Sequence, residues 1–500
     1  MGWQTHNVLN CSFIQNHLLK TYSSEEGSHM ATTAKKPAVM GYLPNDVPPF
    51  GQMVLLGFQH VLTMFPATVL CAILMKFPVS TVLTITGLGT VVALLGSKFA
   101  MGKYIPLYYG SSFSYIAAVT AIMQAKGVEG PVAPPEVISV VTAGFIATGT
   151  INIIVGLIIR LSGGKEAIDK ILPPIVTGPV ACTIGIGLGA AALNMASGAC
   201  CGVTDPVMQL KWWAAATVTL LAAFIFSVYL QGKGFIGMLP ILLAAIFGYI
   251  VAIPLGLVDF SQFGKEALIR APTITFPVFN DPLTATVIVG VGIMAIATIP
   301  ESTAHLYQIS LYVDHLAEEQ GREKYGLARY IGLNLMLDGL NDLVNGLFGS
   351  TAGTNYGENN SLMVISRNYS GPSLLAAGVI AILLGFIGPL AEAVASIPTA
   401  VSGGLAIYLF GVIGMQGIAL MMAEKVNLYD PKSLAIGAAI LIIGIGGNIG
   451  FNGGFLPIPL LQGVFPYGWP AIATGAVVGI VLNLITMAWK PPMERAAVEH

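Results

Sequence analysis

Tyr108-Tyr-Gly-Ser-Ser-Phe113 and Asn355-Tyr-Gly-Glu-Asn-Asn360 are the two stretches that decide the fold. Each inserts glycine and polar side chains into an otherwise apolar segment. Pro106, just before the first stretch, and Gly110 within it should end a helix, and Gly357 should do so in the second stretch. Backbone that is unwound at membrane depth persists only where it is buried in protein or lines a cavity. Paired interruptions in two halves of a chain are typical of a transporter's binding site.

The composition places the chain in a membrane. Its 500 residues are 55% hydrophobic and 9% charged, whereas soluble domains carry about 25% charged residues. The formal net charge of −2 provides no field that would hold nucleic acid. The 5 cysteines form no Cys-x-x-Cys pair, so neither a disulfide framework nor a metal site is indicated. The lipid bilayer is therefore the expected partner of most of the surface.

Residues 1–30 differ from the rest of the chain because they are polar. They end in Gly27-Ser28-His29-Met30, which is typical of an expression-vector remnant. The alternative is a natural disordered tail. In either case we expect this segment to lie outside the fold.

Apolar length predicts the number of membrane crossings, since each crossing needs about 20 mostly apolar residues. The sequence predicts fourteen segments. They lie near 51–75, 78–97, 104–125, 136–160, 173–195, 212–231, 235–256, 283–306, 330–349, 352–367, 371–393, 398–422, 433–450 and 469–489. With both termini in the cytoplasm, most Lys and Arg fall in cytoplasmic loops, as the positive-inside rule requires. The exceptions are Lys76, Lys126, Lys211, Lys265 and Arg270.

The two interrupted segments are the third and the tenth. Seven spans separate them, so the second half of the chain should be inverted in the membrane relative to the first. Helices that restart near Ser111 and Glu358 would direct their first amide N–H groups into the gap. The sequence therefore predicts an all-α polytopic membrane protein of two inverted seven-span repeats, with spans 3 and 10 broken into half-helices. Close helix packing is the alternative explanation for the glycines.

Acidic groups lie next to these interruptions. Glu301 and His305 are four residues apart, hence on one helical face, and Glu358 directly follows Gly357. A carboxylate inside a bilayer is costly unless it is paired, protonated or facing water, so both acids indicate a functional site. The alternatives are an internal Glu301–His305 pair and a helix N-terminal cap at Glu358.

Four further side chains stand out in apolar surroundings. His60 is either a satisfied core group or part of the site. Asp338 and Asp342 are four apart and precede the tenth segment, so we expect them to position it or to share a proton with each other; contact with the ligand is the alternative. Phe113 is either a core aromatic or a platform on which a flat ring stacks.

Several of these motifs resemble the nucleobase–ascorbate transporters, most closely the bacterial uracil and xanthine permeases. The similar stretches are Gln59-His60, Phe65-Pro-Ala-Thr-Val-Leu70, Tyr109-Gly-Ser-Ser-Phe-Ser114, Leu172-Pro-Pro-Ile-Val-Thr-Gly178, Glu301-x-x-x-His305 and Thr354–Arg367. The resemblance extends from about residue 50 to 490. It implies proton-coupled uptake of a nucleobase, with sodium as the alternative coupling ion and no other cofactor.

The resemblance also implies a domain arrangement. Residues 50–161 and 283–393, spans 1–4 and 8–11, would form a core that holds the substrate. Residues 172–256 and 398–489, spans 5–7 and 12–14, would form a gate that dimerises. The core would slide past the gate as in an elevator, in the inner membrane of a bacterium.

Site residues follow from the same resemblance. Glu301 and Glu358 would bind the base, and the Gly357 backbone would donate to it. The remaining substrate-binding candidates are Phe113, Ser112, Ala67 and His305. Glu358, His60 and Asp338 are the candidates for proton coupling. Ser361 and Ser366 replace the family's Gly and Thr, and Pro300 before Glu301 is unfamiliar, so uracil, xanthine and urate stay open as substrates.

Other classes are less compatible with these residues. An oxyanion exchanger of the same architecture would suit two helix N-termini, but Glu301 and Glu358 would repel sulfate or bicarbonate unless both were protonated. No polar face recurs along several spans, as a channel would need. An enzyme is not indicated, because the sequence has no His-Glu-x-x-His, Gly-x-Ser-x-Gly or Walker motif.

Overall fold

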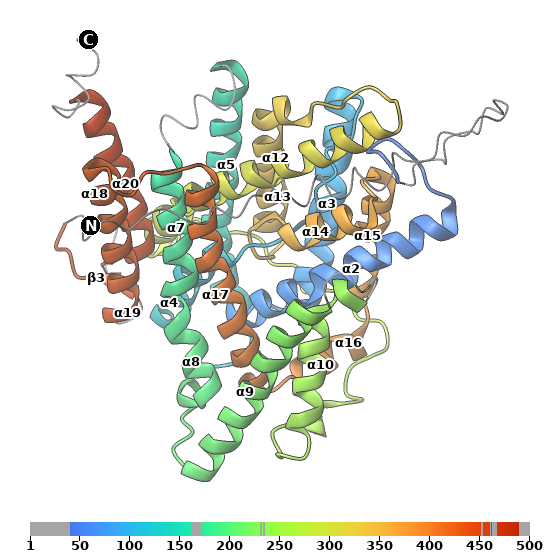
Figure 1. Ribbon diagram of the computed structural model, residues 1–500. Coiled ribbons are helices and arrows are strands. Elements are labelled where there is room, and N and C mark those ends of the chain that lie inside the picture. Colours follow the sequence, from blue (N-terminus) through green and yellow to red (C-terminus); the bar gives the residue numbers. More distant parts are fainter. Residues whose placement is uncertain are drawn as a thin grey trace, which may run out of the picture. The chain divides into compact units, whose positions relative to one another are not determined.

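The computed structural model describes residues 41–162, 172–230, 233, 236–451, 454–460, 462 and 468–489. The predicted tail at 1–30 lies outside these residues. The described part is built almost entirely of helices, joined by short 3-10 turns and four short strands (Figure 1).

Nine helices in the described part are long and apolar enough to cross a membrane. They are Phe50–Leu74 (α2), Val79–Met101 (α3), Pro135–Ser162 (α5), Pro174–Ser197 (α7 and α8), Pro206–Tyr229 (α9), Thr284–Glu319 (α11 and α12), Thr399–Ala423 (α17), Pro431–Gly450 (α18 and α19) and Ala471–Ala488 (α20). Three shorter apolar helices are Phe113–Ala125 (η1 and α4), Pro240–Ala252 (α10) and Gly371–Leu384 (α15). The chain is therefore an integral membrane protein. The count of fourteen spans and the inverted repeat stay predictions.

Three helices with more polar or shorter sequences complete the framework. They are Ile331–Leu347 (α13), Gly357–Ser366 (α14) and Gly388–Ala395 (α16). Strands β3 (Phe455–Leu456) and β4 (Trp469–Pro470) pair with each other ahead of α20.

The helices pack in two groups. In one, α13 packs against α3 and α5, α15 against α2 and α3, and α11 against α5. In the other, α17 packs against α7, α8 and α9, while α20 packs against α18 and α7 (Figure 1). Glycine allows the closest approaches: a Cβ added at Gly339 of α13 would lie 2.5 Å from the carbonyl oxygen of Gly149 in α5.

The eighth predicted segment is longer in the structure than in the prediction. The sequence indicated 283–306, whereas α11 (Thr284–Gly292) and α12 (Ala295–Glu319) follow each other with only a short break. The prediction stopped where polar residues become frequent. In the structure that polar part of α12 stays helical and continues beyond the apolar region.

The two interrupted segments are partly extended, which differs from the predicted half-helices. The first contains β1 (Tyr109–Ser111), η1 (Phe113–Tyr115) and α4 (Ile116–Ala125), and the second contains β2 (Gly353–Asn355) and α14. Each segment is thus a strand followed by a helix. The helical part restarts at Phe113 in the first segment and at Gly357 in the second.

Strands β1 and β2 pair with each other in antiparallel register. Tyr109 lies opposite Asn355, and Ser111 lies opposite Gly353. Two hydrogen bonds extend the ladder: the Tyr356 N–H donates to the Tyr108 carbonyl at 2.8 Å, and the Ser112 N–H to the Ala352 carbonyl at 3.0 Å. The pairing explains why this backbone tolerates burial, since each unwound segment satisfies the other's polar groups.

Gly110 is required at the crossing of the strands. A Cβ at this position would lie 2.1 Å from Cζ of Tyr356. The Tyr356 hydroxyl donates to the Ser111 carbonyl at 3.0 Å and also lies 3.0 Å from Oγ1 of Thr68 in α2. The ring therefore fastens the second interrupted segment to the first segment and to α2.

Candidate functional site

A cavity of about 480 Å³ lies where the two interrupted segments meet α12, α7 and α17. Its volume is within the range of about 300–1,000 Å³ that is usual for small-molecule sites. The polar residues in its wall are Ser111, Ser112, Ser114, Thr177, Ser227, Glu301, His305, Gln308, Thr354, Tyr356, Glu358, Ser361, Tyr408 and Gln416.

Two carboxylic acids face this cavity. Glu301 lies in α12 directly after Pro300, and Glu358 lies in the first turn of α14. Both side chains line the cavity and are exposed to it. Within the described part of the chain, neither acid forms an ion pair. The cavity therefore contains two carboxyl groups that are available to a ligand.

The N-terminus of α14 borders the same space. Its capping residue, Tyr356, has ψ 124° and provides no side-chain hydrogen bond to the first turn. Gly357 begins the helix and lines the cavity. The first N–H groups of a helix lack partners within it, and its dipole is positive at this end. This end of α14 suits a ligand's carbonyl oxygen or a negative charge.

His305 connects α12 to the second interrupted segment. Its Nδ1 lies 2.9 Å from the backbone carbonyl oxygen of Asn355 and 2.7 Å from Oδ1 of the same residue. Because a carbonyl oxygen only accepts, Nδ1 carries the hydrogen and Nε2 is left as an acceptor in the neutral ring. A Cβ added at Gly357 would lie 3.0 Å from that Nε2. His305 thus holds the junction of β2 and α14 in place and also lines the cavity.

The first interrupted segment contributes Ser112 and Phe113 to the wall. Oγ of Ser112 accepts a hydrogen bond from the Ser114 N–H at 3.3 Å, which caps η1. The Phe113 ring packs edge-on against Phe410 of α17, with ring centroids 6.0 Å apart and an interplanar angle of 79°. The contact between Phe113 and Phe410 therefore joins the two helix groups.

Three predicted site residues do not line this cavity. His60 is 1% exposed and accepts a hydrogen bond at Nδ1 from Asn359 Nδ2 at 3.1 Å. It therefore links α2 to α14 without reaching the cavity. Ala67 is 4% exposed within α2, one residue before Thr68, which contacts Tyr356. Asp338 is fully buried in α13. Their predicted roles stay predictions.

Asp342 supports the site from α13. Its Oδ1 accepts a hydrogen bond from the Gly353 N–H at 2.7 Å, and its Oδ2 accepts one from Asn152 Nδ2 at 3.1 Å. Asp342 therefore holds the start of β2 to α5. This contact matches the positioning role that its place in the sequence suggested.

Several lining residues were not predicted. Gln308 lies seven residues after Glu301, on the same face of α12, so helical periodicity could have identified it. Ser361 donates to the Gly357 carbonyl at 3.0 Å and also lines the cavity. Tyr408 and Gln416 belong to α17, which crosses opposite the acids. Within that apolar helix, no sequence pattern distinguishes the side that faces the cavity.

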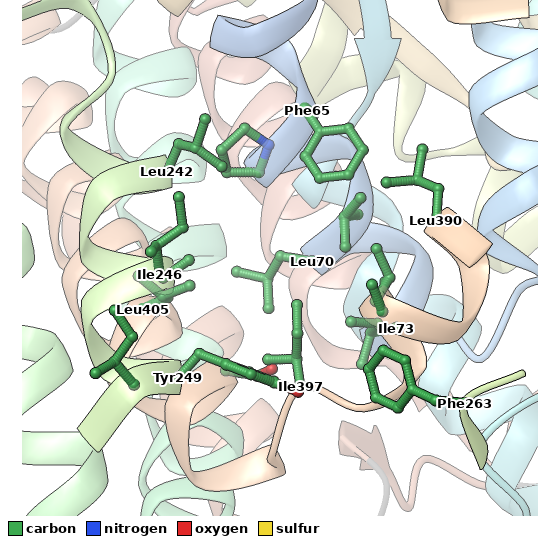
Figure 2. Close-up of a pocket in the computed structure, with 17 residues that line it drawn as sticks. Phe65, Leu70, Ile73, Leu242, Ile246, Tyr249, Phe263, Leu390, Ile397 and Leu405 are labelled. Atoms are coloured by element: carbon green, nitrogen blue, oxygen red, sulfur yellow. The ribbon is translucent and has the colours of Figure 1, made fainter. Parts of the chain in front are cut away.

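A second cavity, of about 380 Å³, lies between α2, α10, α16 and α17 (Figure 2). Leu70, Ile246 and Leu405 are among its apolar side chains, and the few polar ones include Tyr249. The Tyr249 hydroxyl is already hydrogen-bonded to Ser396 at 2.8 Å. This cavity lacks charged groups, so the cavity between Glu301 and Glu358 is the candidate site for a polar ligand.

Comparisons with known proteins relate most of the chain to permeases. A family model described as "Permease family" matches residues 51–453. The uracil permease of Bacillus caldolyticus is 34% identical over 445 residues, which are 88% of this chain and 93% of that protein. The uracil permease of Bacillus subtilis (strain 168) is 31% identical over 469 residues, which are 93% of this chain and 99% of that protein.

Solved structures give a fold-level likeness. The transmembrane domain of the bicarbonate transporter BicA from a cyanobacterium superposes with a TM-score of 0.59 at 15% identity. The match covers 81% of this chain and 98% of that domain. At this identity the likeness concerns the fold alone.

Proposed function

Since the chain belongs to the nucleobase–ascorbate transporter family, a family of permeases, we propose that it imports a pyrimidine nucleobase, with uracil as the first candidate. The relatives at 31–34% identity are named uracil permeases. A xanthine- or urate-type purine is the second candidate substrate.

One observation carries the proposal: Glu301 and Glu358 line one cavity together with the N-terminus of α14. A nucleobase edge alternates N–H donors with C=O acceptors. Carboxylate oxygens accept from the N–H groups, and backbone N–H groups donate to the carbonyls. Glu301 would accept from the ring edge, the Gly357 backbone would donate to it, and Phe113 would stack on its face. Ser112 and His305, which line the same cavity, complete the proposed binding set, and Ala67 stays a predicted member outside the cavity wall.

Proton coupling is assigned to Glu358, with His60 and Asp338 as supporting groups. A protonated Glu358 is uncharged, so it could travel with the base and release its proton inside. Sodium is the alternative coupling ion. The Glu358 side chain faces the cavity. This position supports the exchange of a proton between its carboxyl group and water that enters with the substrate.

The two helix groups support an elevator mechanism. Glu301, Glu358 and Phe113 belong to the group of α2–α5 and α11–α15, the proposed core at 50–161 and 283–393. Residues of α7 and α17 in the proposed gate, at 172–256 and 398–489, provide the opposite wall. In this scheme the fourteen-span chain is a homodimer in a bacterial inner membrane, with both termini in the cytoplasm. Movement of the core past the gate would expose the cavity to either side.

An uptake assay tests which compound the protein transports. Purified protein in proteoliposomes should accumulate radiolabelled uracil when an inward proton gradient is imposed, and excess xanthine, urate, sulfate or bicarbonate should be compared as competitors. Glu301→Gln should abolish uptake. Glu318→Gln provides a matched control, because Glu318 lies in the same helix and pairs with exposed Lys324 at 3.1 Å. Accumulation of radiolabelled sulfate or bicarbonate, with no accumulation of uracil, would establish the oxyanion alternative instead.

A further inference from the structure

A third cavity, of about 540 Å³, lies at one end of the helix group that contains α3, α5, α12 and α13. It is distinct from the candidate nucleobase site, because the two share no lining residue. Its wall combines the end of α3, the last turn of α5 and the turn η5 (Leu327–Tyr330) that leads into α13. Since α3 and α5 are long enough to span a bilayer, their ends place this cavity at a membrane–water interface.

Two arginines provide the charge in the wall. Arg160 lies in the last turn of α5, and Arg329 lies in η5 with its guanidinium 4.8 Å from the centre of the Tyr330 ring. Both side chains are exposed. The start of α13, three residues after Arg329, contacts the end of α5, since a Cβ added at Gly332 would lie 2.8 Å from Cβ of Arg160. No acidic side chain among the described residues lines the cavity.

Of the arginines that the structure describes, Arg160 and Arg329 are the two without an acidic partner, while Arg270 pairs with Glu266. Elsewhere in the described chain, Arg322 pairs with Asp46 at 2.8 Å, Lys324 pairs with Glu318 at 3.1 Å, and Arg367 pairs with Glu319. Among the residues that the structure describes, neither Arg160 nor Arg329 forms an ion pair or a hydrogen bond to an acid. Two positive charges thus border a cavity whose described wall contributes no negative charge.

The surface around the cavity is apolar. Phe99, next to the α3 residues of the wall, is 95% exposed, and Leu161, next to Arg160, is 79% exposed. Ile158 of α5 is 55% exposed. In a membrane-spanning protein such side chains contact acyl chains. Ile159, Met101 and Leu333 continue this apolar surface into the cavity wall.

From this arrangement we infer that the cavity binds the phosphate headgroup of an anionic phospholipid. The guanidinium groups of Arg160 and Arg329 bind the phosphate oxygens, for which the planar, multi-donor arginine is well suited. The acyl chains lie along the exposed apolar side chains of α3 and α5. Basic pockets between membrane helices are known to hold anionic lipid headgroups. A soluble phosphate would use the arginines but would leave the apolar surface uncovered.

A lipid titration tests this site. The full-length protein in a mild detergent is titrated with short-chain phosphatidylglycerol and, separately, with phosphatidylcholine of the same chain length, with the thermal unfolding temperature as the measurement. We expect saturable stabilisation by phosphatidylglycerol and little by phosphatidylcholine. Arg160→Gln and Arg329→Gln should each weaken the affinity about fivefold.

A matched variant controls for the loss of charge. Lys324→Gln removes one positive charge from the loop that leads to Arg329, at a site paired with an exposed acid, and should leave the lipid affinity unchanged. Arg160→Lys should keep part of the affinity, because the charge remains while the bidentate geometry is lost.

Three results would overturn the inference. They are equal stabilisation by both lipids, unchanged phosphatidylglycerol affinity in the double arginine variant, and equal stabilisation by inorganic phosphate alone, which would assign the site to a soluble anion. If the variants cannot be purified, photoactivatable phosphatidylglycerol should label wild-type peptides that contain 159–160 and 328–333. Labelling confined to other peptides would refute the site.

Discussion

Replacing Gly110 by alanine tests the strand crossing on which the candidate site depends. The new methyl group would lie 2.1 Å from Cζ of Tyr356, whereas ordinary contact begins at 3.4 Å. The Tyr356 ring is 4% exposed, and its hydroxyl bonds to the Ser111 carbonyl and to Thr68. The ring can therefore retreat only if it gives up these hydrogen bonds or displaces β2.

The magnitude follows from these contacts. Overpacking a close-packed interior costs about 1–3 kcal/mol, and each of the two hydrogen bonds contributes about 1 kcal/mol. We expect Gly110→Ala to lower the free energy of unfolding by about 3–5 kcal/mol if both hydrogen bonds are lost. It should also weaken uracil binding, because Tyr356 directly precedes Gly357 and Glu358 in the cavity wall.

Thermal unfolding of the purified protein, with and without uracil, measures both effects. Gly411→Ala is the matched control, since nothing lies within 4 Å of the added methyl group in α17. Adding Tyr356→Leu to Gly110→Ala should recover part of the loss, because the smaller side chain relieves the overlap. Equal unfolding temperatures for the Gly110→Ala and Gly411→Ala proteins would refute the reasoning, and so would a double variant that recovers nothing.

Three further substitutions test uracil recognition, proton coupling and the structural support of the site separately. Glu301→Gln should weaken uracil binding at least tenfold, as expected for a lost charge-assisted hydrogen bond of about 1.5–3 kcal/mol; an unchanged dissociation constant in a calorimetric titration would contradict the recognition role. Glu358→Gln should retain uracil exchange in preloaded proteoliposomes but lose its response to a pH gradient, and a preserved response would remove the proton assignment. Asp342→Ala leaves the Gly353 N–H without its acceptor, so it should destabilise the protein by about 1–3 kcal/mol while uptake, measured at equal amounts of folded protein, keeps its proton dependence.

Much of the helical framework could be predicted because membrane spans have a strong sequence signal. Length and apolar content located α2, α3, α5 and α17 to within a few residues. The strands could not be predicted in this way. A strand of three residues such as β1 has no measurable periodicity, and its pairing with β2 depends on contacts between distant parts of the sequence. Gly110 and Gly357 indicated that each segment is interrupted but not that the backbone before the restarted helix is an extended strand.

Prediction of the site depended on the type of residue. Glu301 and Glu358 could be located because a carboxylate in an apolar segment is costly and therefore informative. His305 followed from its spacing to Glu301. His60 has the same chemical character but faces Asn359 behind α14, and sequence alone does not tell which side of a helix faces a cavity. Gln416 of α17 was missed for the same reason.

The pairing of β1 with β2 also limits how the proposed transport cycle can operate. The ladder from Tyr109 to Asn355, the Tyr356 hydroxyl and the Asp342–Gly353 bond fasten both interrupted segments to α13 and to each other. Phe113 and Glu358 therefore belong to one rigid unit, and a hinge within either segment would break this ladder inside the membrane. The contact between Phe113 and Phe410 crosses between the two helix groups without a hydrogen bond. Breaking this apolar contact costs less free energy than breaking the hydrogen bonds between β1 and β2. If the cavity opens to alternate sides, the movement should therefore separate α17 from the interrupted segments and leave the two acids fixed relative to one another.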